Sequence, residues 1–149
     1  MEKNNPVALS TRDKVFLIED EMRKYPQLDL PVKDHFSDGV YGRELFIPAG
    51  TLLTGEIHKY RQLNVLVAGD ISVHTEDGIR RVQAPFIVVS PAGTKRIAYA
   101  HTDCVWLTVH GTHETDLGKI KEKFIAQNDA EYSAFLEQTK LKELTSCPG

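Results

Sequence analysis

Three residues of the segment 52–60 have the types and the spacing that acid–base chemistry needs. Glu56, His58 and Tyr60 stand at alternate positions, and alternate residues of a β-strand share one face. A histidine with its ordinary pKa is a general base near neutral pH, and a tyrosine hydroxyl can act as the acid. The sequence has no CxxC pair, P-loop, GxGxxG or GxSxG motif. The pattern therefore indicates proton transfer or polar-ligand binding on this face.

The surrounding sequence is typical of a small β-barrel or sandwich. Short apolar stretches recur, and Gly or Pro separates them every several residues, which favours antiparallel strands over alternating strands and helices. Asp77-Gly78 predicts a hairpin turn, because glycine tolerates the positive φ of such turns. The expected strands cover residues 44–48, 52–60, 63–67, 70–75, 79–83, 86–89, 96–100 and 105–110, with a further short strand near 35–36.

Helical patterns flank this β-rich region. Residues 10–25 begin with the weak capping sequence Ser10-Thr-Arg-Asp13 and stop at Pro26, which ends a helix. Residues 115–144 change to a helical period, with Asp116 as the expected N-cap. We expect these C-terminal helices either to pack on the barrel of the same chain or to form an interface with a second subunit. The apolar positions of the three helices are Val15, Ile18, Met22, Tyr25, Leu117, Ile120, Phe124, Ile125, Tyr132, Phe135, Leu136 and Leu141.

The bulk composition fits one globular domain spanning residues 1–149. The chain has 149 residues, of which 41% are hydrophobic and 26% charged, enough for one core. Its net charge of −3 provides no global basic field, so we expect neither nucleic acid nor a membrane as a partner. Cys104 and Cys147 are expected to be reduced thiols in a cytoplasmic protein, with a disulfide between them as the alternative.

Three segments in the expected order resemble motifs of the cupin, or RmlC-like jelly-roll, family. IPAGTLLTGEIHKY (47–60) is similar to the first motif, QLNVLVAGDISVHTEDG (62–78) to the hairpin that follows, and VVSPAGTKR (88–96) to the second motif. The resemblance implies a mainly β protein whose residues 41–110 form a double-stranded β-helix barrel. The arrangement also resembles small cupin-type proteins of unknown role from tailed bacteriophages.

The resemblance also shows where a metal would be held in a cupin enzyme. Of the four ligand positions only His58 carries a histidine, while Tyr60, Gln62 and Arg96 stand at the other three. An amide replaces a carboxylate poorly, and a guanidinium repels a metal ion. We therefore expect a metal-independent protein. The alternative is a non-standard divalent-metal site that combines His58 with another histidine, above all His101, or with His74, His110 or His35.

With the family register, these residues would form a polar barrel mouth suited to a sugar, nucleotide or organic acid. Arg96 would anchor a carboxylate or phosphate through paired hydrogen bonds. The expected ligand-binding residues are Glu56, His58, Tyr60, Gln62, Asn64 and Arg96. A second, basic and aromatic rim for an anion would comprise Lys95, Arg96, Tyr99, His101 and Trp106, with Lys59 and Arg61 nearby.

The function expected from these residues is the binding of a small anionic metabolite, or catalysis on one, in a homodimer. One alternative is an epimerase or isomerase acting on a sugar, with His58 as base and Tyr60 as acid. Another is a structural or regulatory protein that binds a host or virion protein. In that case Arg96 would pair internally with Glu56 and fill a vestigial pocket.

Overall fold

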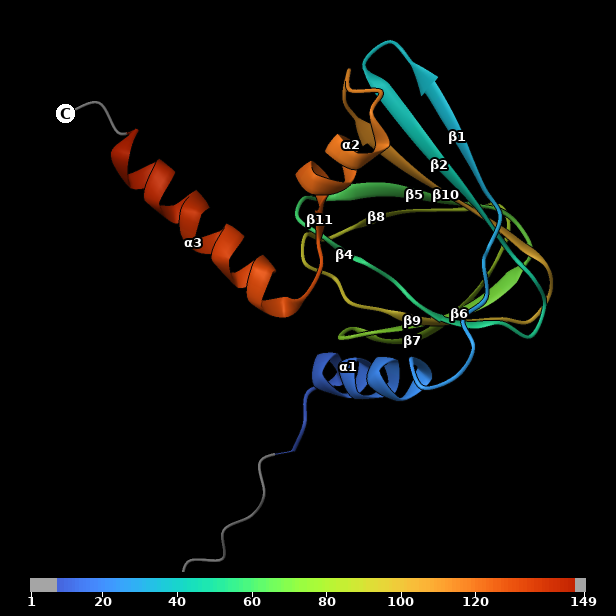
Figure 1. Cartoon of the computed structure of the whole chain (residues 1–149). Helices are drawn as coiled ribbons and strands as arrows, with labels where there is room; N and C mark the ends of the chain where they lie inside the picture. Colours follow the sequence, from blue (N-terminus) through green and yellow to red (C-terminus); the bar gives the residue numbers. More distant parts are fainter. Residues whose placement is uncertain (1–7, 147–149) are drawn as a thin grey trace, which may run out of the picture.

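The computed structural model describes residues 8–146 and contains a β-barrel with three helices outside it (Figure 1). The predicted fold class, a mainly β jelly-roll barrel with an N-terminal helix and a C-terminal helical tail, is confirmed. The elements are α1 (Thr11–Met22), β1 (Val32–Ser37), β2 (Val40–Ile47), β3 (Leu52–Thr54), β4 (Ile57–His58), β5 (Gln62–Ala68), β6 (Asp70–Thr75), β7 (Gly78–Gln83), β8 (Phe86–Ser90), β9 (Ile97–Ala100), β10 (Cys104–Gly111), α2 (Leu117–Phe124), β11 (Ile125–Ala126) and α3 (Asp129–Thr145).

Strands that are distant in sequence pair within two large antiparallel sheets and one two-stranded sheet, which consists of β11 and β4. The five-stranded sheet has the order β1-β2-β10-β5-β8, and the four-stranded sheet has the order β3-β9-β6-β7. In β5, Gln62, Asn64 and Leu66 are buried while Leu63 and Val67 are exposed, because successive strand residues face opposite sides. Side chains from both sheets therefore converge on one interior.

An apolar cluster fills one end of this interior. Its fully or nearly fully buried members come from both sheets, and Trp106 packs against them. Cys104 belongs to this cluster as a free, buried thiol, and burial raises its pKa. The question of a disulfide with Cys147 lies outside the described residues. The buried cluster comprises Ile47, Leu66, Ile71, Ala98, Ala100 and Cys104.

The turn between β5 and β6 depends on Gly69, and alanine there is expected to destabilise the fold. Gly69 has φ +100, and a Cβ at this position would lie 2.4 Å from the carbonyl oxygen of Asp103 and 2.6 Å from Sγ of Cys104. We expect Gly69→Ala to lower the free energy of unfolding by about 2–4 kcal/mol, since backbone strain and overpacking add. Gly78 is the matched control, because it has φ +106 but no atom within 4 Å of the added Cβ. Urea denaturation that gave equal losses for Gly69→Ala and Gly78→Ala would contradict this prediction.

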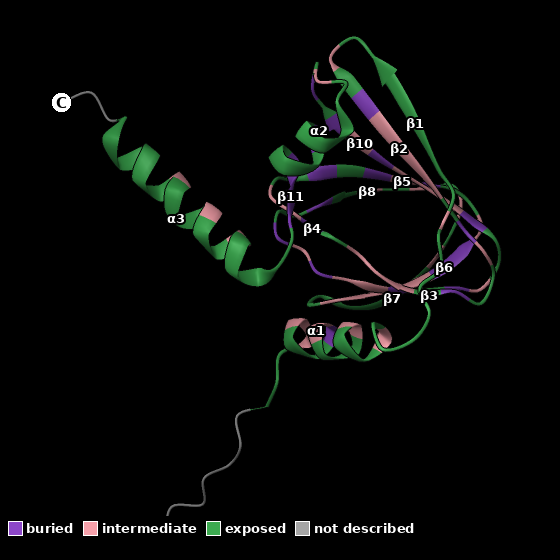
Figure 2. Ribbon diagram, in the orientation of Figure 1, coloured by how far each residue is buried: buried purple, intermediate pink, exposed green. Residues whose placement is uncertain are grey.

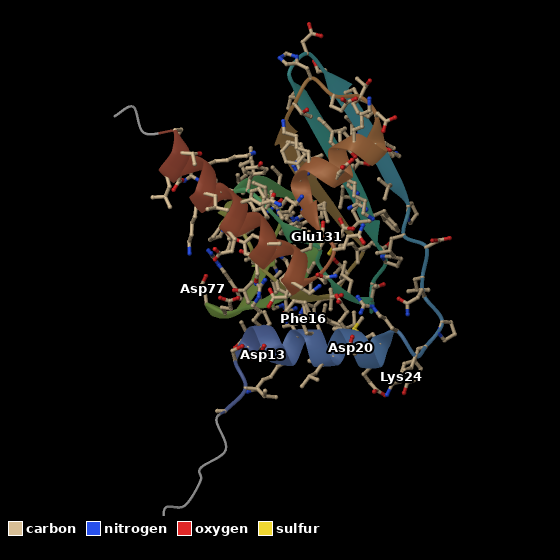
Figure 3. All side chains as sticks on the ribbon, turned by 60° about the vertical axis from the view of Figure 1, so that its left-hand side comes forward. Asp13, Phe16, Asp20, Lys24, Asp77 and Glu131 are labelled. Atoms are coloured by element: carbon tan, nitrogen blue, oxygen red, sulfur yellow. The ribbon has the colours of Figure 1, made fainter. Side chains whose placement is uncertain are left out.

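Helix α1 begins where the sequence predicts but ends at Met22 rather than near residue 25, and only part of its expected apolar face is buried. Ser10 caps it by accepting a hydrogen bond from the backbone of Asp13. Val15 is buried, whereas Ile18 is 40% and Tyr25 64% exposed, so the expected apolar stripe is only partly used. Polar contacts tie the helix to the barrel instead, and Figure 3 shows Phe16 on the side of α1 that faces the barrel.

The C-terminal segment covers the barrel with its first helix only. Asp116 caps α2 as expected, and Ile120 and Phe124 are buried against Tyr41. Helix α3 projects away from the barrel and is largely exposed along its length (Figure 2). Leu136, expected to be buried, is 41% exposed, and Leu141 is 60% exposed. The homodimer stays a prediction. Within residues 8–146 the structure contains no helix whose length and hydropathy would suit a bilayer.

Candidate functional site

A cavity of about 670 Å³ lies between the two sheets, beyond the apolar cluster. Its wall on the five-stranded sheet consists of inward-facing residues in register. Arg43 of β2 pairs with Thr108 of β10, and Thr108 pairs with Asn64 of β5. The neighbouring inward positions of these three strands hold Tyr41, His110 and Gln62, which continue the polar wall toward α2.

A chain of hydrogen bonds runs across this wall. Thr108 Oγ1 donates to Asn64 Oδ1 (2.9 Å), and Asn64 Nδ2 donates to Ser90 Oγ (2.8 Å). Arg96 Nη2, which comes from the facing side of the barrel, donates to the same Ser90 Oγ (2.6 Å). The chain fixes the orientation of the Asn64 amide and holds one edge of the Arg96 guanidinium in place.

The Arg96 guanidinium projects into the cavity without a counter-charge. Within residues 8–146 it forms no ion pair, and the Trp106 ring centroid lies 5.6 Å from its Cζ. Burial lowers the pKa of Arg96, yet a guanidinium stays protonated in proteins. Gly55 makes room for this side chain, since a Cβ there would lie 2.9 Å from Arg96 Cγ. The cavity therefore contains a fixed positive charge with unused donors.

Gln62 contributes an unused acceptor. Its Oε1 atom is buried and has no hydrogen-bond partner among the described residues. Such an atom costs free energy when it stays unpaired, and a donor in the cavity would satisfy it. A hydroxyl or amine group of a ligand has the required chemistry.

Two uncharged histidines stand beside these residues. The rings of His58 and His110 stack with centroids 5.5 Å apart. Burial, together with the charges of His110, Arg96 and Arg43, lowers the pKa of His58 to about 3. Burial and Arg43 also lower the pKa of His110. Both imidazoles are therefore neutral at pH 7 and able to donate and accept hydrogen bonds.

The neutral His58 predicts a specific dependence of stability on pH. Its pKa is lowered in the folded state, so its contribution is present above about pH 6.5, the ordinary histidine value, and is lost as the unfolded chain takes up protons below it. We expect the free energy of unfolding to fall by about 1–2 kcal/mol between pH 7 and pH 5 on account of His58. His58→Gln should reduce this fall, as measured by urea denaturation at both pH values. An unchanged slope in His58→Gln would contradict the assignment.

The structure separates the predicted ligand residues into two groups. His58, Gln62, Asn64 and Arg96 line the cavity, and Glu56 lies at its edge, 3.5 Å from Lys121. Tyr60, Lys95, Tyr99 and His101 do not line it. The expected strand 52–60 is interrupted, because β3 pairs with β9 whereas β4 pairs with β11.

The four residues outside the cavity have other partners. Tyr60, 45% exposed, packs edge-on against Phe124 and Phe135. Lys95 Nζ is buried against Glu19 of α1. His101 Nε2 lies 2.7 Å from Ser72 Oγ, with Tyr99 beside its ring. The predicted basic rim is therefore not assembled, and Trp106 lies under Arg96 inside the cavity.

Solved structures with the same architecture were found, all at low sequence identity. KdgF from Halomonas sp. is 16% identical, and the match covers 62% of this chain and 92% of that one with a TM-score of 0.49. A cupin-2 domain containing protein from Shewanella frigidimarina is 14% identical over 63% and 91% of the chains, with a TM-score of 0.45. An RmlC-like cupin family protein with a double-stranded β-helix fold, from Methanocaldococcus jannaschii, is 14% identical over 57% and 82%, with a TM-score of 0.47. No family model and no curated protein matches the chain.

The strand order of this chain itself decides the fold. The first strands of the barrel pair with its last strands, because β2 pairs with β10 and β3 pairs with β9. The strands between them complete the two sheets, β5 and β8 in one and β6 and β7 in the other. This is the double Greek-key pattern of a jelly roll. The chain has the cupin fold. The names of the similar structures do not support the narrower likeness to bacteriophage proteins.

The metal centre that a cupin implies does not fit the residues in this cavity. His58 is the only histidine among the four expected positions, Gln62 provides an amide, and Tyr60 points away. The guanidinium of Arg96, held by Ser90, would repel a divalent ion. Within residues 8–146 no three His, Cys, Asp or Glu side chains are grouped to hold a metal. His101 does not lie with His58, because it bonds to Ser72 outside the cavity.

Sequence reasoning missed Arg43 and Thr108 as cavity residues, and Ser90 as the hydrogen-bond acceptor of Asn64 and Arg96. The expected strand began at residue 44, so Arg43 was not assigned an inward position, although β2 extends back to Val40. His110 was named only as a candidate metal ligand. Trp106, Thr108 and His110 stand at alternate positions of β10 and therefore share its inward face. This alternation is the sequence signal that could have placed Thr108 and His110 in the cavity.

Proposed function

We propose that this cupin binds, without a metal, a small metabolite that carries a carboxylate or phosphate group, and that Arg96 anchors this group. The proposal rests above all on one observation, the guanidinium that projects into the cavity bonded only to a hydroxyl. A charge removed from bulk water without a counter-ion is costly. An anion bound through two parallel N–H···O bonds would offset that cost.

The other cavity residues support a hydroxylated ligand. Gln62 Oε1 lacks a donor, and the neutral imidazoles of His58 and His110 offer both donors and acceptors. The volume of about 670 Å³ lies within the range of about 300–1,000 Å³ for small-molecule sites. A sugar acid, a nucleotide or a hydroxylated organic acid has this combination of groups.

The alternative functions have less support from the contacts. The internal Arg96–Glu56 pair expected of a vestigial pocket is not formed, since Glu56 faces Lys121 and Arg96 bonds to Ser90. An epimerase with His58 as base and Tyr60 as acid would need both in the cavity, but Tyr60 packs against Phe124 outside it. Binding of a metabolite is therefore the function that we put forward.

A thermal-shift screen tests the proposal. Purified protein is heated with sugars, nucleotides, organic acids and inorganic phosphate, each with EDTA or with a divalent metal. A ligand that binds the native state raises the midpoint of unfolding, and we expect anionic compounds to do so equally in EDTA. Stabilisation by neutral compounds alone, stabilisation only with the metal, or no stabilisation by any compound would overturn the proposal. Elemental analysis of the purified protein provides an independent check on the metal.

A further inference from the structure

We propose that the ligand carries two acidic groups, and that Arg43 binds the second while Arg96 binds the first. This inference rests on the proposed function, because it assigns the second half of the same cavity. Arg43 lies on β2 between the inward-facing Tyr41 and Leu45, and all three line the cavity. Its half-buried guanidinium makes no hydrogen bond or ion pair within residues 8–146.

The carboxylates near Arg43 are engaged elsewhere or exposed. Asp34 of β1 stands opposite Arg43 in the strand register, but its Oδ1 accepts a hydrogen bond from Tyr41 Oη (2.5 Å). Burial and the Asp34 contact raise the pKa of Tyr41, so the tyrosine stays a donor to Asp34. Glu56 is exposed and faces Lys121, and Asp29 is exposed on the loop before β1. These carboxylates line the same cavity as the two arginines, but among the described residues none of them forms an ion pair with Arg43 or Arg96.

The two arginines approach the cavity from opposite ends of one polar row. The row runs from Arg43 through Thr108 and Asn64 to Ser90, which accepts from Arg96. Three strand spacings of about 4.8 Å separate Arg43 on β2 from Ser90 on β8, so the backbones of these two residues are about 14 Å apart. Both arginine side chains line the same cavity of about 670 Å³, a volume that accommodates a ligand with an acidic group at each end.

His58 lies within reach of both charges. Arg96 and Arg43 each contribute to lowering its pKa, and Arg43 also acts on His110. The neutral imidazoles and the two guanidinium groups therefore share one cavity. A short dicarboxylate, or an acid with one carboxylate and one phosphate, would place an acidic group at each arginine and its middle atoms beside His58 and Gln62.

Paired ligand series separate this inference from the proposed function. Calorimetric titrations compare malonate, succinate, glutarate and adipate with the monocarboxylates of equal carbon number and with inorganic phosphate. We expect one dicarboxylate to bind at least about tenfold more tightly than its monocarboxylate partner. Arg43→Met should remove this advantage while it leaves the monocarboxylate affinity within about twofold, and Arg43→Lys should restore part of it. Arg61→Met, which removes an exposed arginine one residue from Gln62, is the matched control.

Each outcome decides one of the two statements. Equal affinity for mono- and dicarboxylates, or a dicarboxylate advantage that survives Arg43→Met, would overturn the role of Arg43 and leave the proposed function intact. Failure of every carboxylate and of phosphate to bind wild-type protein would overturn the role of Arg43, and it would overturn the proposed function as well when no anionic compound of the thermal-shift screen stabilises the protein. The unfolding midpoint is measured for each variant. If Arg43→Met does not fold, Arg43→Gln replaces it in the same titrations, because its amide keeps hydrogen-bonding capacity without the charge.

Discussion

Arg96→Met is expected to lower the affinity for an anionic ligand by about a hundredfold or more, because removing a desolvated charged partner costs about 2–5 kcal/mol. The variant deletes the fixed charge of the cavity but keeps a side chain of similar length above the Trp106 ring. Isothermal titration with the best compound of the screen measures the loss. Arg96→Lys keeps the charge but not the planar fork, so we expect it to recover only part of the affinity.

Stability distinguishes a binding role from a structural role for Arg96. The guanidinium has no counter-charge within the described residues and only the Ser90 hydroxyl as a hydrogen-bond acceptor. Replacing it with an apolar side chain should leave the free energy of unfolding unchanged or raise it, since the desolvated charge disappears. Arg61→Met, at an exposed position, should change neither affinity nor stability. A folded Arg96→Met protein with wild-type affinity would refute the anchoring role.

The second large effect is expected at the ion pair between α1 and the barrel. Lys95 Nζ donates to Glu19 Oε2 (2.5 Å) and to the carbonyl oxygen of Gly55 (2.8 Å), and Thr54 Oγ1 donates to the same Glu19 oxygen (2.5 Å). The side chains of Lys95 and Glu19 are only 5% and 14% exposed. Lys95→Met removes the buried partner of the Glu19 carboxylate and leaves it only Thr54 and the exposed Arg23, so we expect a loss of about 3 kcal/mol in the free energy of unfolding.

A double variant tests whether this loss comes from the broken pair. Glu19→Leu combined with Lys95→Met removes both charges, so we expect the double variant to be more stable than Lys95→Met alone. Urea denaturation of the wild type, both single variants and the double variant gives the coupling energy. Additive losses would show that the pair does not hold α1 on the barrel.

The same pair predicts how stability responds below pH 5. Burial raises the pKa of Glu19, but the hydrogen bonds from Lys95 and Thr54 and the charges of Lys95 and Arg23 outweigh it, and the net pKa is lowered. A carboxyl group whose pKa is lowered on folding stabilises the protein above its unfolded pKa, and this contribution is lost as the pH falls through the folded pKa. Glu19→Gln should flatten the stability curve below pH 5, whereas the loss due to His58 begins near pH 6.5 and continues down to its folded pKa of about 3. An unflattened curve would contradict this assignment.

Local sequence chemistry determined the elements of this protein. Ser10 and Asp116 cap their helices as expected, because each side chain satisfies a free backbone N–H of the first turn. A hairpin forms at Asp77-Gly78, where β6 and β7 meet with Thr75 opposite Gly78. These features depend on residues only a few positions apart, so the sequence alone was enough to predict them. The motif order then indicated the barrel and placed Gln62 and Asn64 on its inner face.

Only the tertiary structure decided which polar residues share the cavity. The interruption between Thr54 and Ile57 lets β4 pair with β11, and Tyr60 then faces Phe124 and Phe135 outside the cavity. Lys95 and Arg96 are adjacent, but alternation does not say which of the two faces inward. Lys95 pairs with the carboxylate of Glu19 in helix α1, which lies 76 positions away in sequence.

The candidate site changed in the same way. At the positions where a cupin enzyme would hold its metal, His58, Gln62 and Arg96 line a cavity together with Asn64. Arg43 and His110 join them from β2 and β10, at the two ends of the barrel sequence. Period-two alternation reports which residues share a face of one strand. Which strands lie side by side, and hence which charges find a partner, is determined by long-range packing.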